Sequence, residues 1–285
     1  MSEIIGGIFT SHVPAIGGAI HKNLQDTPYW KPFFDGFPPV QQWLAQKKPT
    51  VAIVVSNDHG LNFFLDKMPT FAIGAAPRYD NADEGWGLPL FKSFDGDPAL
   101  SWHIIEHLVE SEFDITTCQQ MLVDHAISIP FELCYPDAQA WPLKIVPIGV
   151  NTVQHPLPSP KRCLALGRAI GEAVRSWGAD ERVVVFGTGG LSHQLDGARA
   201  GFMNRDYDRL CMDSLAPDPD ALTRHSAMDI VELAGTQGVE ILNWIAARGI
   251  LGDDVAELSR NYHIPISNTA AATMLLEVKE PALVA

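Results

Sequence analysis

Three short apolar runs, each followed by a histidine, constrain the fold of this chain more than any other feature of its sequence. The runs are Glu3–Phe9, Val51–Val55 and Val183–Phe186, and the histidines that follow them are His12, His59 and His193. Runs rich in valine and isoleucine are typical of strands buried on both faces of a parallel sheet. Ligands bind at the carboxyl ends of such strands in α/β proteins. We therefore expect the three imidazoles to meet at one edge of a central sheet.

Helical patterns alternate with further strand-like runs along the rest of the chain. Additional strands are expected at Thr70–Ala75, Phe113–Thr117 and Leu143–Gly149. Two helices have defined starts, because Asp97 and Ser159 are good capping residues and each is followed by a proline at the first helical position. The chain has no internal repeat and no linker long enough to separate domains. The pattern predicts a single α/β domain, residues 1–285, with a central, mostly parallel sheet flanked by helices and a metal site at the carboxyl ends of its strands.

Two segments in the N-terminal half of the chain are predicted to connect strands and helices. Gly17–Pro39 is rich in glycine, proline and aromatic residues, so we expect an ordered loop or a short helical excursion, followed by a helix over Val40–Ala45. Arg78–Asp97 contains the sequence DEGWG and many turn formers. Long loops in compact domains usually cover a site or meet a partner. We therefore expect Arg78–Asp97 to be a long surface loop with one of these roles.

Three later segments are interpreted from their local pattern. His125–Leu133 is a mixed apolar segment that a proline interrupts. A helix is expected from near Thr236 to just before Gly249, because glycine commonly follows the last helical residue. The segment Tyr262–Thr273 is expected to turn helical at Asn268.

Charge and composition exclude several classes of protein. The formal net charge is −14 at pH 7, which argues against binding to nucleic acid or to an anionic membrane surface, since both need clustered lysine and arginine. No apolar run approaches the ~18 residues of a membrane span, and no signal peptide is evident. The four cysteines are widely spaced, which favours free buried thiols in a reducing compartment. We expect a cytoplasmic protein.

The residue types at the predicted sheet edge are those of a metal or acid–base site. Neutral imidazole is a common ligand for iron and zinc, and a histidine that binds no metal is a natural acid or base near neutral pH. A redox iron site also needs a carboxylate, and Glu240 is the best candidate because it begins an apolar helix. A carboxylate buried there costs several kcal/mol unless it is paired or bound to metal. The alternative, a surface glutamate that favours the helix dipole, stays open on this pattern alone.

A glycine-rich run, Gly187–Gly190, follows the third apolar run. It resembles a phosphate-binding loop only in part, because no Lys-Ser/Thr pair follows it. Its glycines are better explained by a tight turn or by a close approach of the backbone to a ligand.

Six motifs occur in order along nearly the whole chain. They are TSHVPA (Thr10–Ala15), SNDHG (Ser56–Gly60), VDHAISIP (Val123–Pro130), GTGGLSHQL (Gly187–Leu195), GVEILNW (Gly238–Trp244) and YHIPISNTA (Tyr262–Ala270). Together they resemble the class III (LigB-type) extradiol ring-cleavage dioxygenases, among them the catalytic β chain of protocatechuate 4,5-dioxygenases. Any one of these motifs alone would carry little weight.

The resemblance implies a role for eight residues. It implies that Fe(II) is held by His12, His59 and Glu240. It implies that His193 is the acid–base residue and that His125 is a second active-site histidine. Asn57, Ser267 and Asn268 match polar positions near the substrate, and the last two match positions that address its carboxylate.

The resemblance also implies an activity in the catabolism of aromatic compounds. The expected reaction is Fe(II)-dependent cleavage of protocatechuate by O₂ to 4-carboxy-2-hydroxymuconate semialdehyde. Gallate or a methylated gallate is the alternative substrate, and a zinc enzyme or a non-catalytic metal-binding or interaction protein on the same fold are the alternative functions. The family's catalytic chain pairs with a small α subunit, which predicts a heteromer with Arg78–Asp97 as one docking surface.

Overall fold

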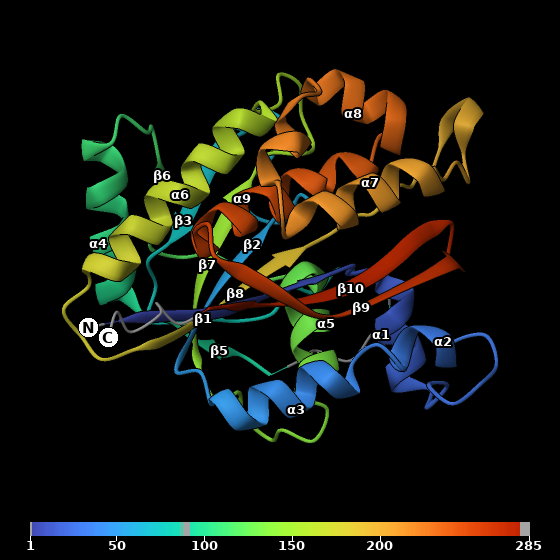
Figure 1. Ribbon diagram of the computed structural model, residues 1–285, viewed down its shortest axis with the longest axis horizontal. Helices are drawn as coiled ribbons and strands as arrows, with labels where there is room; N and C mark the ends of the chain where they lie inside the picture. The colour runs from blue at the N-terminus through green and yellow to red at the C-terminus, as the bar shows by residue number, and fades with distance from the viewer. Residues whose placement is uncertain (1, 86, 88–91, 280–285) are drawn as a thin grey trace.

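An eight-stranded sheet runs through the middle of the molecule and carries helices on both faces (Figure 1). The computed structural model describes residues 2–85, 87 and 92–279. The strand order is β6-β3-β7-β2-β8-β1-β10-β9. The strands are β1 (Glu3–Thr10), β2 (Val51–Ser56), β3 (Phe71–Gly74), β6 (Thr116–Cys118), β7 (Lys144–Val150), β8 (Arg182–Thr188), β9 (Val255–Ile266) and β10 (Thr269–Val278).

The central strands are parallel, as the sequence predicts. β1 pairs with β8, β8 with β2, and β2 with β7 in parallel register, and β3 pairs with β6 in the same way. The pairs β3–β7, β1–β10 and β10–β9 are antiparallel. Since β1, β2 and β8 are parallel neighbours, their carboxyl ends lie together at one edge of the sheet, and the segments carrying His12, His59 and His193 start there.

Alternating residues of the strands point into two separate cores. In β8, Val183 and Val185 pack into one core, whereas Val184 and Phe186 pack into the other. The first core is covered by α4 (Pro98–Glu110), α6 (Pro160–Ser176), α7 (Arg205–Leu215), α8 (Ala227–Ala234) and α9 (Ile241–Leu251), with the short 3-10 helices η1 (Gly197–Arg199), η2 (Pro219–Thr223) and η3 (Gly238–Glu240) nearby. The second core is covered by α1 (Pro14–His21), α2 (Lys31–Phe34), α3 (Pro38–Lys47) and α5 (His125–Cys134).

Both predicted helix caps are present. Asp97 Oδ1 accepts a hydrogen bond from the Leu100 amide at 3.1 Å, and Ser159 Oγ accepts one from the Arg162 amide at 3.2 Å. Each bond satisfies one of the amide donors that the first turn of a helix leaves unpaired.

The helix predicted from near Thr236 to just before Gly249 is α9, which begins later, at Ile241, and ends later, at Leu251. Gly249 lies inside α9, which continues to Leu251 and is followed by Gly252 with φ +82°. Gly249 is needed for packing, because a Cβ there would lie 2.5 Å from the Leu164 carbonyl oxygen on α6. The glycine therefore lets two helices touch along their backbones and does not end the helix.

The predicted surface loop Arg78–Asp97 is anchored in the core at both ends. β4 (Arg78–Tyr79) and β5 (Phe94–Asp95) pair antiparallel, and the side chains of Tyr79 and Phe94 are fully buried. Trp86 and residues 88–91 lie outside the described residues. The prediction of a surface loop is therefore wrong for the two ends of this segment.

Two further local predictions are corrected by the structure. His125–Leu133 belongs to a continuous helix, α5, which contains Pro130 without ending at it. Tyr262–Thr273 forms no helix, because it contributes to the antiparallel hairpin of β9 and β10. The two-residue turn of this hairpin consists of Ser267 (φ +50°) and Asn268 (φ +62°), and positive φ at both positions matches the right-handed twist of the strands it joins.

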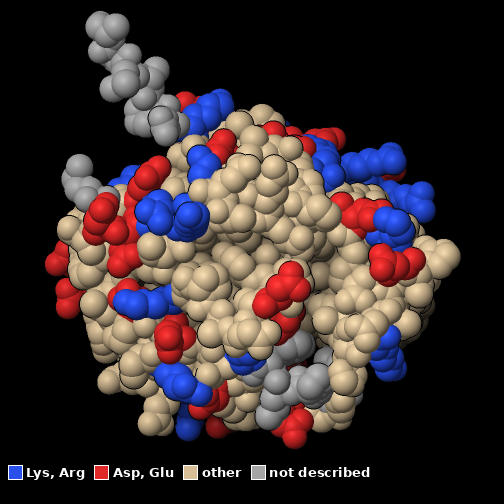
Figure 2. All heavy atoms as spheres, turned by 90° about the horizontal axis from the view of Figure 1, so that it is seen from below, with Lys and Arg blue, Asp and Glu red and all other residues tan. Residues whose placement is uncertain are grey.

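No helix among the described residues combines the length and the apolar character that crossing a bilayer requires. The four cysteines are buried and free. On the face seen from below, most charged side chains of both signs lie toward the margins, and an acidic group lies near the middle, surrounded by uncharged surface (Figure 2).

Candidate metal centre and active site

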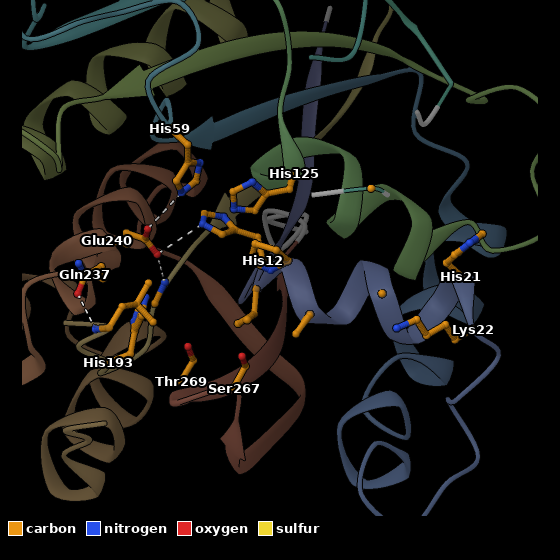
Figure 3. Close-up of a pocket in the computed structure, with 17 residues that line it drawn as sticks. His12, His21, Lys22, His59, His125, His193, Gln237, Glu240, Ser267 and Thr269 are labelled. Atoms are coloured by element: carbon orange, nitrogen blue, oxygen red, sulfur yellow. Dashed lines mark hydrogen bonds and ion pairs between the residues drawn. The ribbon is translucent and has the colours of Figure 1, made fainter. Parts of the chain in front are cut away.

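A cavity of about 550 Å³ opens where β1, β2 and β8 end. Its lining includes His12, His59, His125, His193 and Glu240. Figure 3 shows the Glu240 carboxylate among these rings, with Lys22 at the far side of the cavity beyond α1. A cavity of this size is in the usual range for small-molecule sites. The convergence expected from the three histidines that follow strands is therefore present, and His125 and Glu240 join them.

His12 presents a buried ring nitrogen that has no hydrogen-bond partner. The residue follows β1 and is 4% exposed. Its Nδ1 lies 3.2 Å from the Thr188 hydroxyl, which fixes the orientation of the ring. Its Nε2 is buried and unpartnered, with Glu240 Oε2 3.5 Å away. Because buried polar atoms are almost always satisfied, an orphaned imidazole nitrogen beside a carboxylate makes His12 Nε2 a candidate metal ligand.

His59 is oriented by a buried carboxylate that the sequence analysis missed. Asp124 Oδ2 accepts hydrogen bonds from His59 Nδ1 at 2.9 Å and from the His59 backbone amide at 3.1 Å. Nδ1 is thereby committed to Asp124, and Nε2 is the ring nitrogen that faces the site, 3.7 Å from Glu240 Oε1. Burial alone would raise the pKa of Asp124, but His59 outweighs that effect and lowers it well below its usual range. A carboxylate behind a ligating histidine fixes its tautomer in many metal sites.

Asp124 also caps a helix, and this role is recognisable from the sequence. Its Oδ1 accepts the Ala126 amide at 2.8 Å and so caps α5. An aspartate before an apolar helical run is a recognisable capping signal. Recognising α5 as a helix would have identified Asp124 as its cap.

Glu240 is a buried carboxylate held by the glycine-rich run. It is 6% exposed, and its Oε2 accepts the Gly190 amide at 2.9 Å. A Cβ at Gly189 would lie 2.8 Å from Glu240 Cβ, so glycine lets the backbone approach this side chain. Burial alone would raise the pKa of Glu240, but His12 and His59 outweigh that effect and hold the pKa well below its usual range. Glu240 is thus an ionised buried carboxylate, and the surface alternative is excluded.

His12, His59 and Glu240 can surround one ion. Two donor atoms that each lie about 2.1 Å from a metal are separated by roughly 3.0–3.4 Å. Glu240 Oε2 lies 3.5 Å from His12 Nε2, and the other carboxylate oxygen, Oε1, lies 3.7 Å from His59 Nε2, so each separation is close to this range. His125 also places a ring nitrogen within 4.8 Å of nitrogens of His12 and His59. Its ring, however, is tilted by only 35° against that of His59 at 4.1 Å, so their in-plane lone pairs do not converge well on one ion.

His193 is held in the tautomer that a general base needs. Its Nδ1 lies 2.8 Å from the Leu191 carbonyl oxygen. A carbonyl only accepts hydrogen bonds, so Nδ1 carries the proton and Nε2 keeps a lone pair in the neutral ring. The backbone on both sides is fixed, because the His193 amide donates to Ala234 at 2.7 Å and the Gly238 amide donates to His193 at 3.1 Å.

The residues predicted near the substrate lie in three different environments. Asn57 is buried, and its amide nitrogen lies 3.1 Å from His59 Nε2 and 3.3 Å from Glu240 Oε1. Ser267 lines the cavity from the tip of the β9–β10 hairpin. Asn268, the other turn residue, is exposed and is not among the described residues of the lining.

Comparison with known proteins identifies the family of this chain. A family model described as the catalytic LigB subunit of aromatic ring-opening dioxygenase matches residues 6–274. A gallate dioxygenase of Pseudomonas putida is 37% identical over 202 residues, which cover 71% of this chain and 59% of that protein. A 2,3-dihydroxyphenylpropionate/2,3-dihydroxicinnamic acid 1,2-dioxygenase of Photorhabdus laumondii is 30% identical over 192 residues, which cover 65% of this chain and 55% of that protein.

The chain therefore spans little more than half the length of these curated relatives. The crystal structure of an uncharacterized protein from Escherichia coli K12 superimposes with a TM-score of 0.57 at 12% identity, covering 96% of this chain and 100% of that one. That likeness concerns the fold alone. Because the family model covers nearly all of the central sheet and every residue of the candidate metal centre, the chain belongs to the LigB family of catalytic subunits of aromatic ring-opening dioxygenases.

Proposed function

We propose that this chain, acting as one catalytic domain, cleaves the ring of a carboxylated catechol beside its two hydroxyl groups, with O₂ as the oxidant. The observation that carries the proposal is the buried, unpartnered Nε2 of His12 beside the ionised Glu240 carboxylate and the His59 ring. A cavity large enough for an aromatic acid adjoins these groups. Relatives named as dioxygenases support the reaction class.

The donor set fits Fe(II). His12, His59 and Glu240 make the two-histidine, one-carboxylate combination that leaves coordination positions open, and these three residues would hold the metal. When bound, Fe(II) supplies Lewis acidity and positions for a diol and O₂. The same donors suit Zn²⁺, so metal analysis together with O₂ uptake separates the two.

The chain's own groups account for the proton transfers. His193 Nε2 accepts a proton from a substrate hydroxyl, because its Nδ1 proton is committed to the Leu191 carbonyl. The resulting imidazolium keeps that contact and can return the proton to an oxygen atom as the ring opens. His125, which also lines the cavity, supplies a second imidazole. Ser267, at the cavity wall, offers its hydroxyl to the substrate carboxylate.

Gallate is the substrate that we propose first. The sequence motifs by themselves favoured protocatechuate, but the 37% identity to a gallate dioxygenase supports the gallate alternative more strongly. The two acids differ by one ring hydroxyl group. Recognition of that hydroxyl therefore decides the preference, because a buried polar group in the site that is left without its partner costs about 1–3 kcal/mol.

The test is anaerobic reconstitution with Fe(II), followed by O₂ consumption with gallate, a methylated gallate, protocatechuate and unsubstituted catechol. We expect the highest kcat/KM with gallate and a product heavier than its substrate by the mass of one O₂ molecule. Protein loaded with iron that consumes no O₂ with any of the four would refute the proposal and favour a binding function. Activity restricted to the zinc form would refute the iron assignment.

A small α subunit, implied by the resemblance, remains a proposal about partners. Size-exclusion chromatography with and without a co-expressed small subunit tests it, and a variant at an exposed, described residue of Arg78–Asp97, Arg78→Ala, reports on the proposed docking surface.

A further inference from the structure

The DEGWG segment, which the sequence analysis singled out as a surface feature, delivers a carboxylate to the active site. Glu84 Oε2 accepts the backbone amide of His125 at 2.9 Å, and Glu84 Oε1 accepts His125 Nδ1 at 2.5 Å. Both side chains are well covered, with 3% exposure for His125 and 16% for Glu84. One carboxylate thus clamps two donors of the same residue, at the first position of α5.

This clamp determines the tautomer of the ring. An ionised carboxylate only accepts hydrogen bonds, so the Nδ1 atom of His125 must carry its proton. In the neutral ring the lone pair is then on Nε2. Asp124, the other nearby carboxylate, accepts hydrogen bonds from the Ala126 amide at Oδ1 and from His59 Nδ1 at Oδ2. Glu84 is therefore the carboxylate that holds Nδ1 of His125.

The ring that Glu84 clamps faces the candidate metal centre. Its centroid lies 4.1 Å from that of His59 and 5.2 Å from that of His12, and His125 lines the same cavity. Gly87, three residues after Glu84, lines the cavity too. The docking of this loop and the orientation of His125 are therefore linked by the Glu84 contact.

We propose that Glu84 is a positioning residue that locks His125 in the Nδ1–H tautomer, so that Nε2 is presented to the substrate as a hydrogen-bond acceptor. The effect on turnover rests on the function proposed above, whereas the effect on the tautomer does not. The role expected for Arg78–Asp97 therefore includes the active site, through Glu84.

The Glu84→Gln variant tests the lock, because glutamine has one acceptor and one donor where glutamate has two acceptors. The backbone amide of His125 always donates, so the glutamine oxygen must face it. The NH₂ group then faces Nδ1, which is satisfied only if Nδ1 loses its proton and Nε2 gains it. Glu84→Gln should thus convert His125 from the Nδ1–H to the Nε2–H tautomer.

The matched control is Asp83→Asn. It removes one negative charge from the adjacent, exposed residue, and its side-chain oxygen can keep the contact with the Gly85 amide, which is 3.0 Å in the native chain. The readout is ¹⁵N NMR of the histidine rings in metal-free protein. We expect the Nδ1–H tautomer for His125 in the native chain and in Asp83→Asn, and the Nε2–H tautomer in Glu84→Gln. An unchanged tautomer in Glu84→Gln, or the same conversion in Asp83→Asn, would overturn the inference.

Turnover of the iron-loaded variants completes the test. We expect kcat of Glu84→Gln to fall about tenfold or more, the effect typical of losing an orienting partner, with iron content unchanged and with Asp83→Asn equal to the native chain. Normal kcat in a Glu84→Gln variant with a converted tautomer would overturn the role in the reaction. If Glu84→Gln is unstable, Glu84→Ala removes both acceptors without adding a donor, and a tautomer as fully fixed as in the native chain would then overturn the lock. Failure of the proposed function differs from these outcomes, because native iron-loaded protein would itself be inactive.

Discussion

Replacing Gly189 by alanine should expel the metal by moving Glu240, whereas replacing Gly190 should not. A Cβ at Gly189 would lie 2.8 Å from Glu240 Cβ and 2.9 Å from Glu240 Oε2, against 3.4–4 Å for ordinary contact. Glu240 would therefore have to move by about 0.6 Å, more than the ~0.5 Å within which a working site holds its groups. The matched variant Gly190→Ala adds a Cβ whose nearest neighbour is the Ile241 amide nitrogen, at 3.8 Å.

Both variants strain the backbone, but by different amounts. Gly190 has φ +60°, in the left-handed region that alanine occupies at a cost of about 1–2 kcal/mol. Gly189 has φ +115°, outside that region, where about 1–3 kcal/mol of strain adds to the displacement of Glu240. We expect a fall in Tm of about 2–4 °C per kcal/mol for each variant.

Iron binding separates the two effects. Iron content after reconstitution, with metal affinity by titration, should show Gly190→Ala close to the native chain and Gly189→Ala weakened about 10- to 100-fold or more. Equal iron affinity in the two variants, with Gly189→Ala folded, would refute the reasoning, because it would mean that Glu240 does not hold the metal or that it adapts freely.

The other predictions concern side chains that line or support the cavity. His193→Ala should keep near-normal iron content while kcat collapses by about 100-fold or more, since the ring acts on protons, and loss of iron as its main effect would place His193 among the ligands. Glu240→Ala should lose iron, as measured by metal analysis after gel filtration, because two neutral imidazoles remain, and full occupancy would contradict its assignment. Ser267→Ala should mainly raise KM for carboxylated substrates, by about fivefold to tenfold for one lost hydrogen bond, and an equal change with unsubstituted catechol would argue against a carboxylate contact.

Local sequence patterns were sufficient where a residue's environment follows from its neighbours in the chain. The valine-rich run before His59 formed a buried parallel strand because β-branched residues suit a sheet covered on both faces. Asp97 and Ser159 capped their helices because a capping bond spans only three residues. The convergence of His12, His59 and His193 followed from the rule that parallel strands share one carboxyl edge.

Local patterns failed where distant residues decide the conformation. Residues 270–276 include alanine, methionine and leucine, all good helix formers, yet they form a strand because β1 pairs with β10 along the edge of the parallel core. The burial of Glu240 does not follow from its own helix either, because the backbone of Gly189, just after β8, packs against its side chain.

The α/β class, the main strands and caps, and the set of histidines at one sheet edge follow from the amino-acid sequence, because they depend on short-range periodicity and on strand direction. The carboxylates that stand behind the rings are set by the folded chain. Asp124 supports His59 from 65 residues away and Glu84 supports His125 from 41 residues away, and no spacing rule connects such pairs. Hydrogen bonds of this kind form between whichever groups the packed sheet and helices bring within 3 Å, so they become visible only when the chain is folded.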